Sequence, residues 1–124
     1  MTYCALVVDD DPASRLMYHQ ILTGMGFNVL QAEDGAAGMH LLQNNPFHLV
    51  VLDMLLPKMS GTDLFLYARQ AQHLRETTFI VISAHARFGE RLPLTALDHF
   101  LVKPAQSQKI RELAQDVLTA VRKP

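Results

Sequence analysis

Short apolar runs alternate along this chain with longer segments whose apolar positions follow a helical period. The five runs are ALVV (5–8), NVLQA (28–32), HLVVL (48–52), TFIVIS (78–83) and HFLV (99–102). This alternation is typical of a parallel sheet that is wrapped by helices on both faces. The pattern therefore predicts an α/β domain of five successive strand and helix units.

Four helices are expected from period and capping signals. Asp11 can cap a first helix with Pro12 at its first position, and Gly24 and Gly26 offer a stop. Residues 34–45 carry a weaker helical pattern. Two further helices are indicated by apolar positions at helical spacing: Leu64, Tyr67, Ala68, Ala71 and Leu74, then Ile110, Leu113, Ala114, Val117, Leu118 and Val121.

The segment between the fourth and fifth runs leaves little room for a helix. It contains Gly89 and Pro93 near its middle. Proline disfavours helical geometry at Leu92 and costs about 3 kcal/mol inside a helix. We therefore expect a fourth helix of at most about two turns, or an irregular segment, and no unbroken helix from Arg87 to Leu97.

Length and charge restrict the class of protein. The 124 residues are 49% apolar and carry a formal charge of −1, which suits a single soluble domain over 1–124. No apolar run approaches the roughly 20 residues of a membrane span, and MTYCALVV lacks a charged signal start, so a cytoplasmic location is expected. Cys4 is the only cysteine, which excludes an intrachain disulfide. The balanced charge argues against direct binding to nucleic acid or membranes.

Polar residues follow four of the five runs. Asp9 and Asp10 come after the first, Asp53 after the third, Ser83 ends the fourth, and Lys103 follows the fifth. In an open sheet of this kind, ligands bind beyond the carboxyl ends of the strands. If the first and third strands are neighbours, their carboxylates converge and repel by roughly 4 kcal/mol per pair at an effective dielectric of 20. A cation is needed there, and Mg²⁺ suits these oxygen ligands.

Four segments resemble the receiver domains of two-component response regulators: VVDDDP, VLDMLLPKMSG, VISAHA and FLVKP, in the order of that family. The resemblance covers the whole chain. It implies a flavodoxin-like (βα)5 fold with strand order 2-1-3-4-5, because chemotaxis receivers have that order. It also implies a signalling function rather than an enzyme's, with the domain catalysing its own phosphorylation and slow dephosphorylation.

The resemblance assigns the metal and acceptor positions. Asp53 matches the aspartate that takes a phosphoryl group from a histidine kinase or phosphotransfer protein. Asp10 matches the direct Mg²⁺ ligand, Asp9 the acid that holds the ion mainly through water, and the Leu55 carbonyl the third protein ligand. Lys103 matches the lysine that pairs with phosphoryl oxygens.

The resemblance also assigns the switch positions. Ser83 matches the hydroxyl residue that shifts inward on activation, and Phe100 the aromatic residue that turns with it. Leu55 and His85 occupy positions at which receivers vary and which modulate the rate of phosphoryl loss. An output domain or partner protein is expected to read the switch. In this family, a full fourth helix often contributes to the face that dimerises or binds an output domain, so a short one should impair that pairing.

Two alternatives belong to other classes of protein, and a third is a receiver that has lost phosphorylation. A phosphatase with an aspartyl intermediate would need a second acid two residues after the nucleophile, where this chain has Leu55. A histidine phosphotransfer module would be a helical bundle, which the five strand-like runs contradict. A degenerate receiver would keep the fold as a phosphorylation-independent interaction module, but none of the chemical positions is missing.

Overall fold

The computed structural model describes residues 2–122, with side chains described as far as Ala120. Its centre is a five-stranded parallel sheet in the order β2-β1-β3-β4-β5. The strands are β1 (Tyr3–Val8), β2 (Phe27–Ala32), β3 (Leu49–Asp53), β4 (Thr78–Ser83) and β5 (His99–Val102). The predicted runs, the parallel pairing and the strand order are all confirmed.

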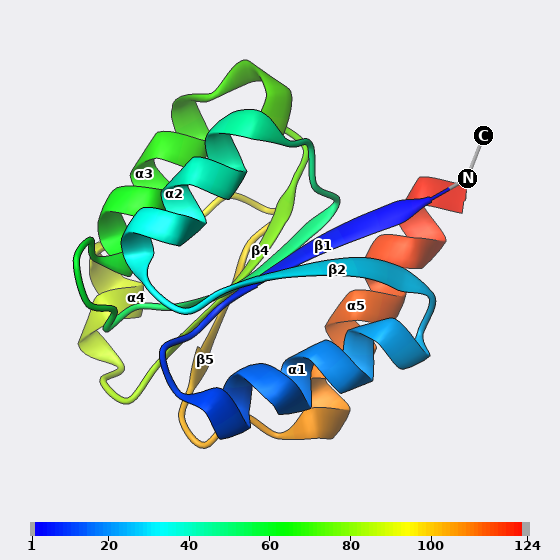
Figure 1. Ribbon diagram of the computed structural model, residues 1–124, viewed down its shortest axis with the longest axis horizontal. Helices are drawn as coiled ribbons and strands as arrows, with labels where there is room; N and C mark the ends of the chain where they lie inside the picture. The colour runs from blue at the N-terminus through cyan, green and yellow to red at the C-terminus, as the bar shows by residue number, and fades with distance from the viewer. Residues whose placement is uncertain (1, 123–124) are drawn as a thin grey trace.

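Helices cover both faces of this sheet (Figure 1). They are α1 (Pro12–Gly24), α2 (Gly35–Asn44), α3 (Gly61–Gln70), α4 (Arg87–Arg91) and α5 (Ser107–Arg122), with a 3₁₀ helix at Gln72–Leu74. Side chains alternate between the faces along each strand. Val7 and Val51 therefore pack with α1 and α5, whereas Val8 and Leu52 pack with α2 and α3. None of the described helices is both long and apolar enough to cross a bilayer.

The predicted boundaries of the first two helices are confirmed. Asp11 caps α1 by accepting a hydrogen bond from the Ser14 amide at 3.1 Å, and Pro12 is its first residue. The chain leaves α1 after Gly24 through Gly26, whose φ of 104° favours glycine. Helix α2 occupies Gly35–Asn44, within the expected range of 34–45.

One predicted helix is shorter than its apolar period indicates. Helix α3 ends at Gln70, because Ala71 is extended (φ −79°, ψ 125°). The period nevertheless continues to Leu74, which is buried from the separate 3₁₀ turn. Arg69 donates a hydrogen bond to the Leu74 carbonyl of this turn at 3.1 Å. The side chain of Val121, expected on the apolar face of α5, lies outside the described residues.

The expectation of a short fourth helix is confirmed. Helix α4 contains only Arg87–Arg91. Leu92 is extended (φ −83°, ψ 138°), as its position before Pro93 favours. The irregular segment after Pro93 ends at Asp98, which accepts hydrogen bonds from the Thr95 amide and hydroxyl at 2.9 Å.

Candidate acceptor and metal site

Strand β3 places Asp53 at the centre of the carboxyl edge of the sheet. All five residues of β3 are buried between β1 and β4, and Asp53 is only 4% exposed. A buried carboxylate needs compensating partners. The Lys103 ammonium lies 3.2 Å from Oδ2 of Asp53, and the Leu55 amide donates to Oδ1 at 3.3 Å. Lys103 follows β5, and β4 lies between β5 and β3, so the lysine side chain reaches across the end of β4 to contact Asp53.

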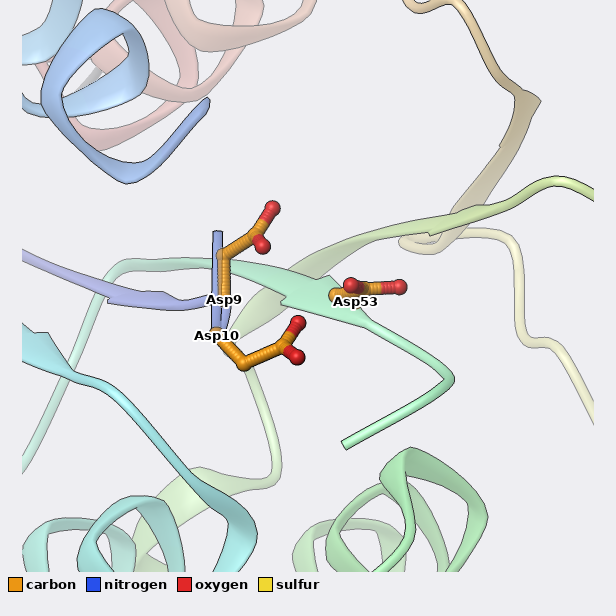
Figure 2. A group of neighbouring side chains, drawn as sticks. All are labelled: Asp9, Asp10 and Asp53. Atoms are coloured by element: carbon orange, nitrogen blue, oxygen red, sulfur yellow. The ribbon is translucent and has the colours of Figure 1, made fainter. Parts of the chain in front are cut away.

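Asp9 and Asp10 lie next to Asp53 because β1 pairs directly with β3. Asp9 is 2% exposed and accepts a hydrogen bond from the Asp11 amide at 2.9 Å, whereas Asp10 is exposed. One carboxylate oxygen from each of Asp9, Asp10 and Asp53 lies within 4.8 Å of the other two. Figure 2 shows Asp9 and Asp10 extending from the end of β1 toward the side on which Asp53 lies.

The clustered charges shift the acid–base equilibria of the site. Burial, with a contribution from the nearby Asp53 carboxylate, raises the pKa of Asp9 to about 6. Partial burial opposes the charged form of Lys103, but its hydrogen bond and attraction to Asp53 outweigh this and raise the lysine pKa. The lysine therefore stays cationic beside three acids. The carboxylate oxygens are hard ligands of the kind Mg²⁺ takes, so the residues present fit this ion.

The remaining sequence-predicted residues surround this group. Ser83 is fully buried at the end of β4, and its hydroxyl accepts a hydrogen bond from the His85 amide at 3.1 Å. The imidazole of His85 is exposed and lies against the Phe88 ring. Leu55 is 53% exposed.

Phe100 is partly buried on the α4 side of β5. A Cβ atom added to Gly89 would lie 2.8 Å from the Phe100 ring. The aromatic ring therefore packs directly against the backbone of the short α4.

Two further side chains at this edge escaped the sequence interpretation. Arg15 donates from Nη1 to the Asp9 carbonyl at 2.9 Å and so fixes the backbone of the acidic loop. Tyr18 is buried in α1, and this burial together with the negative Asp9 and Asp53 raises its pKa to about 12. A lone arginine or tyrosine in a helix gives no pattern that would reveal either contact.

Comparison with known proteins finds a family whose model matches most of this chain. Residues 5–115 match the response regulator receiver domain. The chain is 36% identical over 118 residues to the sensor histidine kinase GacS of Pseudomonas protegens, covering 91% of this chain and 12% of that protein. It is 30% identical over 120 residues to a probable chemotaxis protein CheY of Rhizobium etli, covering 94% and 93%.

Solved structures agree with the observed fold. A CheY-like receiver domain protein from Methanospirillum hungatei superposes with a TM-score of 0.79 at 26% identity, covering 97% of this chain and 99% of that one. The response regulator TrrA of Thermotoga maritima, in complex with Mg²⁺ and BeF, superposes with a TM-score of 0.81 at 24% identity, covering 94% and 99%.

These matches differ in extent. The chain spans 12% of the length of the GacS kinase but nearly all of the chemotaxis protein. Receiver domains therefore occur among its relatives both inside long kinases and as proteins of about this size. The family match runs from within β1 into α5 and includes Asp9, Asp10, Asp53 and Lys103, and the chain belongs to the response regulator receiver domain family.

Proposed function

We propose that Asp53 accepts a phosphoryl group from the phosphohistidine of a sensor histidine kinase or phosphotransfer protein. The observation that carries this assignment is the buried Asp53 carboxylate, in contact with Lys103 and grouped with Asp9 and Asp10. The likeness to receiver domains within histidine kinases supports the class of partner. We place this receiver unit over residues 1–124 and in the cytoplasm.

In the proposed step, a carboxylate oxygen of Asp53 forms a bond to phosphorus while the bond from phosphorus to the donor imidazole nitrogen breaks. The electron pair of that bond leaves with the imidazole, which takes up a proton. The Lys103 ammonium, now 3.2 Å from Asp53, pairs with a phosphoryl oxygen as negative charge accumulates. Small phosphoryl donors would serve in the same way, and slow attack by water would reverse the modification.

Asp9, Asp10, Asp53 and the Leu55 carbonyl would hold Mg²⁺ at this site. When bound, the ion would offset the charge of the carboxylates and of the incoming phosphoryl group. Arg15 and the Asp11 amide keep Asp9 in place through its carbonyl and its carboxylate. This arrangement keeps the acids close despite their mutual repulsion.

Ser83 and Phe100 would carry the change out of the site. A hydroxyl group has one donor and two acceptor positions. Ser83 can therefore donate to a phosphoryl oxygen while it accepts from the His85 amide. An inward shift of Ser83 would then pull His85 inward, together with the segment that leads from β4 to α4. The Phe100 ring lies against Gly89 and would turn inward into the space that the movement of Ser83 opens. An output domain or partner protein would read the altered α4 and β5 surface.

A beryllofluoride titration, followed by ¹⁹F NMR with and without Mg²⁺, tests the assignment. We expect a bound signal only when both reagents are present, and none for Asp53→Asn. Asp116→Asn is the matched control, because Asp116 is exposed on α5, away from the site. A signal in Asp53→Asn equal to that of the unchanged protein would show that another residue is the acceptor.

The same titration addresses a degenerate receiver. Such a protein would keep the fold and show no response to beryllofluoride with Mg²⁺. The presence of all the acidic, lysine and hydroxyl positions at one edge of the sheet favours the active receiver.

A further inference from the structure

The loop from Met54 to Ser60 connects Asp53 to α3 and packs against the start of α2. The Gly35 amide, at the first residue of α2, donates to the Pro57 carbonyl at 3.1 Å. A Cβ atom added to Gly35 would lie 1.8 Å from the Met59 carbonyl oxygen and 2.5 Å from its carbon. These are backbone atoms, so no side-chain rotation could relieve the overlap. A side chain at residue 35 would therefore displace the loop.

An ion pair joins the same two segments. Asp34 caps α2 by accepting from the Ala37 amide at 2.8 Å, and its second carboxylate oxygen lies 3.4 Å from the Lys58 ammonium. Lys58 has a φ of 71°, which brings its side chain back toward α2 from a tight turn. The lysine side chain is 69% exposed, so this pair is weak on its own. It adds to the closer contact at Gly35.

The base of the loop, where it joins α3 at Gly61, is also held by backbone contacts. The Gly61 amide donates to the Met54 carbonyl at 3.1 Å, and a Cβ atom there would lie 2.6 Å from the Asp53 carbonyl. The loop is thus closed at its base by Gly61 and braced at its tip by Gly35. With the base held by Gly61, a displacement of the tip would move the segment between them, which includes Leu55.

We propose that Gly35, assisted by Asp34, is a positioning residue for the metal site: the first turn of α2 sets the place of the loop that supplies the Leu55 carbonyl. This inference rests on the proposed function, because it requires that Mg²⁺ binds beside Asp53. Groups that orient metal ligands from behind typically change metal affinity 10–100-fold when altered. Gly35 touches neither the ion nor the phosphoryl group, and it acts only through the loop.

Gly35→Ala is the direct test, with Gly24→Ala as its matched control. Gly24 ends α1, and an added Cβ there would meet nothing within 4 Å. Isothermal titration calorimetry should show Mg²⁺ affinity at least about tenfold weaker in Gly35→Ala and unchanged in Gly24→Ala. Phosphorylation by a small phosphoryl donor should need correspondingly more Mg²⁺, yet reach within about twofold of the original rate at saturating Mg²⁺. A variant that is merely destabilised would not combine a weaker Mg²⁺ affinity with a nearly unchanged phosphorylation rate at saturating Mg²⁺.

Asp34→Asn decides the matter if Gly35→Ala does not fold. Asparagine still caps a helix but removes the attraction to Lys58. We expect Mg²⁺ affinity about two- to fivefold weaker, as for the loss of one exposed ion pair, with Asp116→Asn as the control for charge. Mg²⁺ affinity equal to that of the controls, in whichever of these variants folds, would overturn the role of α2. Failure of the unchanged protein to bind Mg²⁺ would instead overturn the proposed function.

Discussion

Replacing Arg69 by methionine should destabilise the fold far from the acceptor site. Arg69 lies on α3 with its side chain 11% exposed, and it donates to the Leu74 and Thr77 carbonyls at 3.1 and 2.8 Å. Its guanidinium carbon lies 5.1 Å from the centre of the Phe79 ring, and its Nη1 lies 3.8 Å from the Asp98 carboxylate. The Asp98 side chain is completely buried, so the substitution leaves its negative charge without a cation.

The magnitude follows from this burial. Removing one partner of a buried ion pair typically costs 3–5 kcal/mol. Asp98 keeps hydrogen bonds from the Phe79 amide and from Thr95, so we expect about 3 kcal/mol. Unfolding entropy of about 2.1 cal/mol/K per residue over 124 residues makes each kcal/mol worth roughly 4 °C, so the midpoint should fall by about 12 °C.

Urea and thermal unfolding followed by circular dichroism would measure this loss. Arg111→Met, at an exposed position of α5, is the matched control and should change stability by less than about 0.5 kcal/mol. The double variant Arg69→Met/Asp98→Asn should lose less than the sum of the two single losses, because no buried charge is then stranded. An Arg69→Met protein within about 1 kcal/mol of the original would refute the reasoning.

Three further predictions concern the site and its output face. Leu55→Asn should accelerate loss of the phosphoryl group, because leucine cannot orient an attacking water; an unchanged or slower decay of radiolabelled protein would contradict this. Burial raises the pKa of Asp9 to about 6, above the ordinary 3.8, so without Mg²⁺ the folded state holds this proton more tightly than the unfolded chain. The unfolding free energy should therefore fall as pH rises through about 6, and Asp9→Asn should lack this component in parallel urea titrations. Because α4 is confined to Arg87–Arg91, beryllofluoride should not induce the ordinary receiver dimer through α4, β5 and α5; light scattering that detects this dimer, with its packing confirmed by crystallography, would refute the inference.

The sequence by itself determined the layout of this protein. The five apolar runs, the cap at Asp11 and the break at Pro93 act over a few neighbouring residues, so each leaves a local pattern. Parallel strands present their carboxyl ends at one edge, and this rule brings Asp53 and Lys103 to the same place before any coordinates exist. The resemblance to receivers then supplied the strand order, which alternation alone leaves open.

Only the tertiary structure decided which distant segments touch. The overlap between Gly35 and the Met59 backbone depends on how α2 packs beside the loop after β3, and no periodicity records that packing. Helix α3 likewise ends at Gln70, where Ala71 is extended, although the apolar period continues to Leu74. Local propensity and period fix the direction in which a side chain points, whereas its partner is fixed by chain segments many residues away, whose positions follow from the packing of the whole sheet.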